Sequence, residues 1–234
     1  MQGWSGKLTE YELPAKQNWL GAKPSPDGSK LAILGCNQVH NTNSKGEPLI
    51  VYIADIDGKI LKTIQTSLLS EYNSNVLAPM PVEFDWMADG KNLIIEAWNQ
   101  DTYSTTLQKL DIANEMSSLL AVNTYSPSMS PDGKKIAMFY TDEPKKHITY
   151  TEVQVFDLES KVLSSFYIKG GDNITWDDDS KNILIWSDYR EGRDQVLTNI
   201  NLGTGKTTSF EVKDFISPLY IRSEDIVYVG GTPK

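Results

Sequence analysis

Three acidic side chains stand where alternating apolar segments begin, and paired acids can carry out acid–base chemistry. Glu83 and Asp85 lead into the segment that ends at Trp86, and Asp172 leads into the segment that ends at Trp176. An acid facing a carboxylate is the arrangement that cleaves glycosidic bonds, with one group as acid and the other as base or nucleophile. The alternative is that these are ordinary charges at strand ends, paired or in solvent.

Glu96 is a further acid, at a position that is apolar elsewhere in the chain. Seven residues after each of four recurring turn acids stand Leu34, Glu96, Phe139 and Trp186. A buried charge is costly, so an inward-pointing Glu96 needs a partner or a raised pKa. Glu96, Glu83 and Asp172 are therefore candidate anchors for a ligand in a central channel. The alternatives for Glu96 are an outward-pointing side chain, or a structural pair with a nearby Lys or Tyr.

Aromatic and charged residues form a second candidate group, in the segments that join the second and third strands of each repeat. Trp98, nine residues after Asp89, is predicted to begin such a loop. Loops on a rigid scaffold often carry binding residues, and Trp, Tyr and Arg are enriched in binding hot spots. The candidate binding residues are Trp98, Tyr103, Tyr140, Asp142, Asp188, Tyr189 and Arg190. The alternative is that these loops have no binding role.

Several other chemistries are excluded by spacing. Residues 203–208 look like a phosphate loop, but Ile200 stands where that motif needs Gly, and the segment fits a turn between strands. The acids in residues 172–179 do not continue as a calcium loop, and His40 and His147 lack the neighbours of a zinc site. No Gly-x-Ser-x-Gly motif is present. The sequence thus predicts no catalytic residue, metal or cofactor.

A repeated phrase predicts the elements that position these residues. Ser-Pro-Asp-Gly at 25–28 and 130–133, with degenerate copies elsewhere, favours a tight turn between two strands. Alternating apolar residues precede each turn, and an apolar strand follows it. The acidic turn positions are Asp27, Asp89, Asp132, Asp179 and Glu224, at intervals of 62, 43, 47 and 45 residues. Such periods predict a repeat architecture, usually a propeller.

Third and fourth strands complete each repeat. They are predicted at 51–56 and 60–64, at 153–158 and 162–167, and at 196–202 and 207–212, with a looser third strand at 107–112 in the second copy. Four antiparallel strands match a propeller blade. The fourth copy is the fullest, with Trp176 before an acidic turn and Ser-Asp-Tyr-Arg-Glu-Gly at 187–192. The pattern resembles the TolB-type β-propeller repeat over nearly the whole chain.

This resemblance implies an all-β fold of four-stranded antiparallel blades, in one domain over residues 1–234. Residues 8–13 match an outer strand, whereas residues 215–230 supply only inner strands. We therefore expect five blades, the last closed by the N-terminal strand, because closure removes an open sheet edge. The alternative is a piece of a larger ring. Propellers serve as binding platforms, peptidase lids and enzyme scaffolds, including glycoside hydrolases, so the fold alone does not give the function.

Composition narrows the choice of partners. A net charge of -9 argues against nucleic acid and anionic membranes, and no apolar stretch is long enough for a membrane span. A single cysteine, Cys36, excludes an intrachain disulfide. With the TolB resemblance, we expect an extracytoplasmic domain, in the periplasm or at the cell surface, whose leader is absent from this chain. The mature part of a lipoprotein is one such case.

The leading functional prediction is a non-catalytic platform that binds a protein or peptide through its loop-rich face. Two long loops, at residues 35–48 and 66–81, are predicted to extend this face, and such loops are uncommon without a function or disorder. One alternative is a glycoside hydrolase or lyase that acts on a polysaccharide with axial carboxylates. Another is a propeller domain of a larger receptor or peptidase. The sequence leaves the oligomeric state open.

Overall fold

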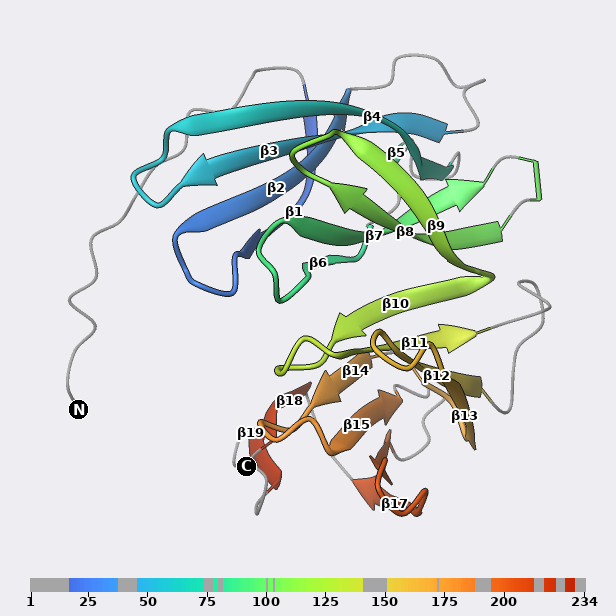
Figure 1. Ribbon diagram of the computed structural model, residues 1–234. Coiled ribbons are helices and arrows are strands. Elements are labelled where there is room, and N and C mark those ends of the chain that lie inside the picture. The colour runs from blue at the N-terminus through green and yellow to red at the C-terminus, as the bar shows by residue number, and fades with distance from the viewer. Residues whose placement is uncertain are drawn as a thin grey trace, which may run out of the picture.

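All regular elements of the described chain are β-strands. The computed structural model describes residues 17–37, 46–73, 78–79, 82–99, 101–102, 104–140, 151–171, 173–187, 195–212, 217–221 and 226–229 of the 234. Its strands follow one another as successive antiparallel sheets (Figure 1). The predicted all-β class is therefore confirmed.

Four groups of strands have the predicted four strands each, and the first two groups belong to one nine-stranded sheet because Leu69 pairs with Trp98. Blade one contains β1 (Gln17–Pro24), β2 (Lys30–Asn37), β3 (Gly46–Asp55) and β4 (Ile60–Asn73). Blade two contains β6 (Phe84–Trp86), β7 (Asn92–Asn99), β8 (Ser104–Asp111) and β9 (Met116–Val122). Blade three contains β10 (Thr124–Met129), β11 (Lys135–Tyr140), β12 (Thr151–Asp157) and β13 (Leu163–Ile168). Blade four contains β14 (Asn173–Trp176), β15 (Asn182–Ser187), β16 (Gln195–Asn201) and β17 (Thr207–Val212).

The fifth repeat is described as a hairpin. It consists of β18 (Ser217–Ile221) paired with β19 (Ile226–Val229), which confirms the predicted inner strands. The first strands of neighbouring blades contact one another in order, from β1 to β6, β10, β14 and β18. The proposed closing strand at 8–13 lies outside the described residues, so closure of a five-bladed ring stays a prediction.

One predicted loop is largely a strand. β4 continues to Asn73, where the sequence predicted a loop over residues 66–81, because β3 begins early and supplies a partner for it. The pairing runs on from Pro48 opposite Leu69 to Gly46 opposite Glu71, after a shift in register. At that shift the Thr66 hydroxyl donates a hydrogen bond to the Leu49 carbonyl, at 2.7 Å. A short strand, β5 (Ala78–Pro79), pairs with the end of β4.

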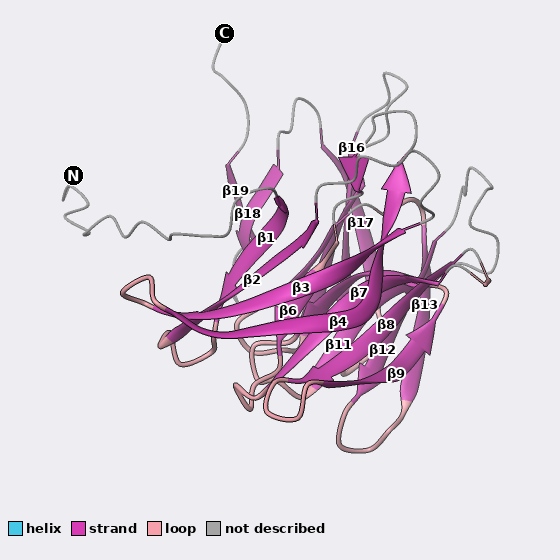
Figure 2. Cartoon of the chain, turned by 90° about the horizontal axis from the view of Figure 1, so that it is seen from above, coloured by secondary structure: helices cyan, strands magenta, loops and turns pink. Residues whose placement is uncertain are grey.

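In the four described blades, the turns between first and second strands and between third and fourth strands lie at one end, which we call the turn end. The opposite end is the loop end (Figure 2). In the Ser-Pro-Asp-Gly turns, the hydroxyls of Ser25 and Ser130 donate to Asp27 and Asp132, each at 2.6 Å. Hydrogen bonds from Ser25 and Ser29 lower the pKa of Asp27 to about 2. Each turn between third and fourth strands is capped by its own side chain, whose carboxylate or amide oxygen accepts hydrogen bonds from backbone amides later in the turn. The capping residues are Asp55, Asp111, Asp157 and Asn201.

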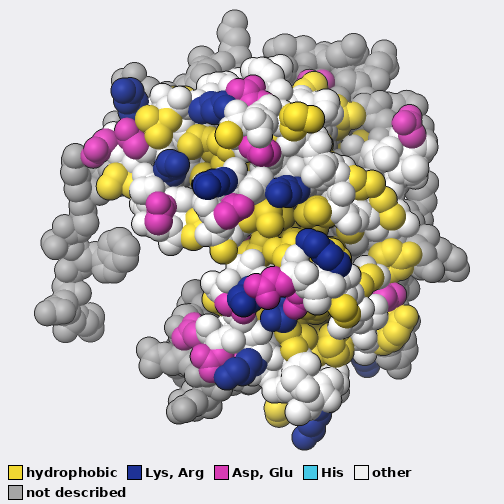
Figure 3. Space-filling view, in the orientation of Figure 1, with side chains coloured by type: hydrophobic (Ala, Val, Ile, Leu, Met, Phe, Trp, Pro, Cys, Tyr) yellow, Lys and Arg dark blue, Asp and Glu magenta, His cyan; other side chains and the backbone are white. Residues whose placement is uncertain are grey.

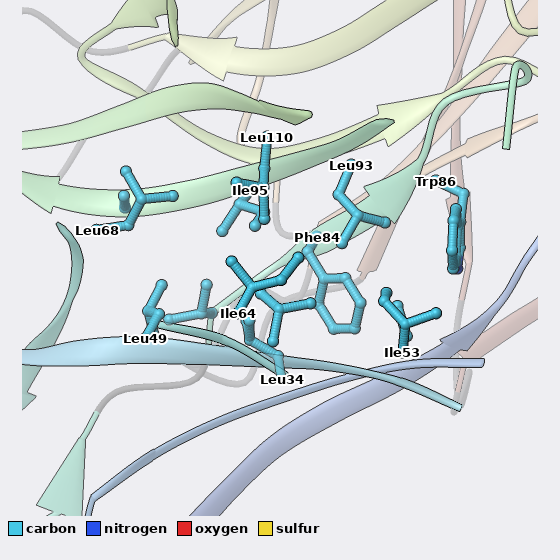
Figure 4. Packing of buried hydrophobic residues seen from close by; sticks show 14 residues of the cluster. Leu34, Leu49, Ile53, Ile64, Leu68, Phe84, Trp86, Leu93, Ile95 and Leu110 are labelled. Atoms are coloured by element: carbon cyan, nitrogen blue, oxygen red, sulfur yellow. The ribbon is translucent and has the colours of Figure 1, made fainter. Parts of the chain in front are cut away.

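The core lies between neighbouring blades. Blades one and two enclose a large apolar cluster that includes Leu34, Ile64, Phe84 and Leu93 (Figure 4). A similar cluster between blades three and four is built from both sheets around Phe139. The cluster between blades two and three is smaller and contains four fully buried residues, Ile94, Leu107, Ile136 and Met138.

Tryptophans tie the blades together in twos. Trp86 of blade two is 3% exposed, and its Nε1 donates to the Lys23 carbonyl of blade one at 2.8 Å. Trp176 of blade four occupies the same turn-side position and donates to the Ser128 carbonyl of blade three at 3.1 Å. Both tryptophans are buried core residues. In blade three the equivalent position holds Met129, so the junction of blades two and three has no such bond.

Candidate functional site

The described residues include five of the candidates, namely Trp98, Tyr140, Glu96, Glu83 and Asp85. The first four lie at or near the loop end of blades two and three, and Asp85 is the middle residue of β6. The remaining candidates, Tyr103, Asp142, Asp172, Asp188, Tyr189 and Arg190, lie outside the described residues. The site is therefore built from the junction between these two blades.

Trp98 and Tyr140 are strand residues with half-buried side chains. Trp98 was predicted to begin a loop, but it lies in β7 opposite Thr105 of β8, because the pairing of these strands continues to Asn99. Tyr140 is the last residue of β11. Both side chains are held by the sheet and still reach the surface at the loop end.

Glu96 points from blade two towards blade three. It lies two residues from Ile94 on β7 and shares the face that packs against blade three. Its Oε2 accepts a hydrogen bond from the backbone amide of Ser126, at 2.9 Å. A backbone amide is thus one partner of this carboxylate. The Glu96 amide in turn donates to the carbonyl of Glu83, whose own side chain is exposed.

The Ser126 amide is available because β10 is irregular there. The register of β10 on β11 shifts between Tyr125 and Ser128, and Ser126 has a φ of 50°, in the left-handed region. Such a bulge takes a residue out of the ladder and re-aims its groups. Here it turns an amide towards Glu96.

A row of four side chains crosses the loop end of blade three. Thr124 lies opposite Tyr140, Tyr140 opposite Glu152, and Glu152 opposite Tyr167. Directly opposed residues share a face, and Met138, two residues before Tyr140, belongs to the cluster shared with blade two. The row therefore faces the same junction as Glu96, beyond the apolar side chains that gather where these blades meet (Figure 3).

Glu152 is held as a carboxylate. Burial acts to raise its pKa, but hydrogen bonds from Ser165, Gln154 and Tyr167 outweigh burial and lower the pKa. The Ser165 hydroxyl lies 2.6 Å from Oε1, and Gln154 Nε2 lies 3.0 Å from the same oxygen. Tyr167 is 72% exposed, so the row is open to solvent at its outer edge.

Thr124 is the buried end of the row. Its side chain is 2% exposed, and its Oγ1 has no hydrogen-bond partner in the described structure. An unmade hydrogen bond of this kind costs on the order of 1–3 kcal/mol. The hydroxyl thus keeps an unused capacity to donate and accept.

The arrangement offers groups that can bind a ligand. Two carboxylates, two tyrosines and an unpartnered hydroxyl suit a polar or cationic ligand. Within the described ranges, no three His, Cys, Asp or Glu side chains gather as a metal site, and no helix could span a membrane. Sequence reasoning missed Glu152 because it started that strand at residue 153. The alternation of Glu152 and Gln154 with Val153 and Val155 was the signal available.

Comparisons with known proteins identify the fold. No protein-family model matches the chain, and no curated protein matches it. Among solved structures, it is similar to the β-propeller domain of the Trilobed protease from Pyrococcus furiosus, with 15% identity and a TM-score of 0.60 over 87% of this chain and 60% of that chain. It is also similar to a putative TolB from Agrobacterium tumefaciens, with 17% identity and a TM-score of 0.59 over 85% of this chain and 64% of that one.

A third similar structure is a puromycin hydrolase, the S511A mutant in complex with PGG. The identity is 15% and the TM-score 0.58, over 84% of this chain and 29% of the hydrolase. These likenesses show a TolB-like β-propeller fold. The chain spans less than two thirds of each of these proteins.

Proposed function

We propose that this TolB-like β-propeller is a non-catalytic platform that binds a protein or peptide at its loop end. The observation that carries the proposal is the placement of Trp98 and Tyr140, which are half-exposed on strands at that end. The turn end, by contrast, is made of short turns capped by their own side chains. Aromatic side chains held by rigid strands are typical anchors of an interface.

The setting of the platform is proposed on the same basis. The resemblance to TolB supports an extracytoplasmic location, in the periplasm or at the cell surface, including the mature part of a lipoprotein. The net charge of -9 supports a protein partner over nucleic acid or an anionic membrane. An acidic surface attracts partners that carry positive charge.

A second candidate is supported by the peptidase structures. The likeness to the puromycin hydrolase covers 84% of this chain but only 29% of the hydrolase, so the fold matches one part of that larger chain. This chain could accordingly be the propeller domain of a larger receptor or peptidase.

A peptide display library tests the platform. The full chain is expected to select peptides whose binding weakens at least tenfold in the double variant Trp98→Ala/Tyr140→Ala, because anchors of this kind carry about 2 kcal/mol or more each. The control is Ile56→Ala/Met116→Ala, which removes exposed apolar side chains from the turn end. Melting curves establish that both variants fold. Equal binding by both double variants would contradict the proposal.

Two further variants address the remaining candidates. Tyr189→Ala/Arg190→Ala is expected to weaken the same peptides. Glu83→Gln/Asp172→Asn is expected to leave them bound. If the latter variant instead abolishes a measured hydrolysis of polysaccharides by the wild-type chain, the glycoside hydrolase alternative replaces the platform.

A further inference from the structure

We infer that the loop end of the junction between blades two and three is a pocket for an arginine side chain of the partner. The inference rests on the proposed function and names the chemistry that the platform recognises. The residues that would line it are Glu96 from blade two and the row Thr124, Tyr140, Glu152 and Tyr167 from blade three, next to the bulge at Ser126.

The first support is that the two acids depart from the repeat at the same junction. The residues equivalent to Glu96 are Leu34, Phe139 and Trp186. The residues equivalent to Glu152, found from the register of second and third strands, are Ile50, Thr106 and Val196. No other described blade has an acid at either position. Because Glu96 faces blade three and Glu152 faces blade two, the two acids place negative charge on both walls.

The second support is the unpartnered hydroxyl of Thr124. It is nearly inaccessible, and it shares the face of Tyr140 and Glu152 through the strand register. On the turn side of this row the junction is filled by apolar side chains such as Met138 and Ile136. A ligand must therefore approach from the loop end, and a ligand N–H that reaches Thr124 Oγ1 would satisfy it.

The third support is the aromatic content of the row. Glu152 lies between Tyr140 and Tyr167 across the sheet. A guanidinium group is planar, donates to carboxylates in a fork, and stacks on aromatic faces, whereas an ammonium is a compact point charge. Carboxylates on both blades, tyrosines on either side of Glu152 and the hydroxyl of Thr124 therefore fit arginine better than lysine.

The direct test uses a small probe with a matched neutral control. N-acetyl-arginine amide is titrated into the ¹⁵N-labelled full chain, and N-acetyl-citrulline amide, which has nearly the same shape without the charge, is titrated in parallel. We expect the arginine probe to shift the amide signals of Thr124, Ser126 and Glu152, and to bind at least tenfold more tightly than citrulline. Equal binding of the two probes, or shifts confined to other blades, would overturn the inference.

Three variants separate the pocket from general charge and from stability. Glu152→Gln is expected to weaken the arginine probe at least tenfold, while Glu159→Gln, which removes an acid at the turn end, leaves it unchanged. Thr124→Val is expected to raise the melting temperature and to weaken the probe about threefold, since it removes a costly but useful hydroxyl. Equal losses in both Gln variants, or tighter probe binding by Thr124→Val, would contradict the pocket.

The peptide library distinguishes this inference from the proposed function. If the selected peptides need Trp98 and Tyr140 but contain no arginine, the pocket is wrong and the platform stands. If the arginine probe binds at the pocket but no peptide depends on the loop end, the platform is wrong and the pocket stands. Arginine-containing peptides that lose affinity in Glu152→Gln support both.

Discussion

The turn end and the loop end of the blades differ in how their polar groups are hydrogen-bonded. At the turn end, carboxylates and hydroxyls bond to groups within their own turns, and one turn rests directly on the next blade at Gly133 and Ala88. At the loop end, Glu96 reaches across a junction to a left-handed Ser126, and the Thr124 hydroxyl stays without a partner. Polar groups that bond locally stabilise a fold, whereas polar groups that remain unsatisfied are available to a ligand. We therefore expect changes at the turn end to lower stability and changes at the loop end to lower binding.

The largest effect on stability is expected for Gly133→Ala. Gly133 has a φ of 68°, and a Cβ there would lie 1.9 Å from the Cβ of Ala88. Left-handed strain and overpacking together should cost roughly 3 kcal/mol or more, measured by urea unfolding. Gly28→Ala is the matched control, with the same φ and no atom within 4 Å, and should cost only about 1 kcal/mol. Equal costs would show that the contact between blades contributes nothing.

Trp176→Phe is expected to cost about 2 kcal/mol. The change removes the hydrogen bond to the Ser128 carbonyl and leaves a small cavity at the turn end of the junction between blades three and four. The same change at Trp19, which is 40% exposed, should cost well under 1 kcal/mol. Thermal unfolding of the two variants gives the comparison, and a smaller loss for Trp176→Phe would contradict the role of the bond.

Two variants of Ser180 separate the contribution of a hydrogen bond from the cost of backbone strain. Its φ is 58°, as expected for a position that is Gly in other copies, and its buried hydroxyl accepts a hydrogen bond from the Asp132 amide of blade three at 3.0 Å. Ser180→Ala loses the bond and keeps the strain, so it should cost about 1 kcal/mol. Ser180→Gly loses the bond but relieves the strain, so it should be nearly neutral. Denaturant midpoints should rank Gly above Ala, and the reverse order would be inconsistent with this account.

The smallest expected effect is on the pH dependence of stability, through Asp27. Hydrogen bonds lower the pKa of Asp27 from 3.8 to about 2 in the folded chain. A lowered folded pKa stabilises the protein above pH 4, and this contribution is lost as the pH falls towards 2. Asp27→Asn should therefore flatten the change in melting temperature between pH 5 and pH 2.5. An unchanged pH dependence in Asp27→Asn would contradict this account.

Sequence reasoning found the turn end well because repetition marks it. Ser-Pro-Asp-Gly correctly predicted the turns between the first and second strands of blades one and three. Even there one role differs: Asp179 was aligned as the turn acid, but Asp177 accepts the amides of Lys181 and Asn182. A carboxylate at the Ser position can reach those amides directly, which the alignment did not reveal.

The loop end was predicted less well, because what matters there departs from the repeat. Glu96 was singled out by alignment, but its hydrogen bond from the Ser126 amide is marked by no side-chain pattern. Thr124 and Glu152 are unremarkable in the sequence and meet only through the register of four strands. Strand ends also depend on pairing with a distant segment, which is why Trp98 was placed in a loop and residues 66–73 were not recognised as a strand.

We expect the junction between blades two and three to act as a hinge, because the tryptophan hydrogen bonds described above join the other blades in pairs. A tryptophan hydrogen bond joins blade one to blade two, and another joins blade three to blade four, whereas the junction between blades two and three has Met129 at the equivalent position. Slow opening motions should therefore concentrate along this hinge, where the smallest of the three apolar clusters resists them. A ligand that contacts both blades would add interactions across this junction. Its binding is therefore expected to reduce the opening motions between the two pairs of blades.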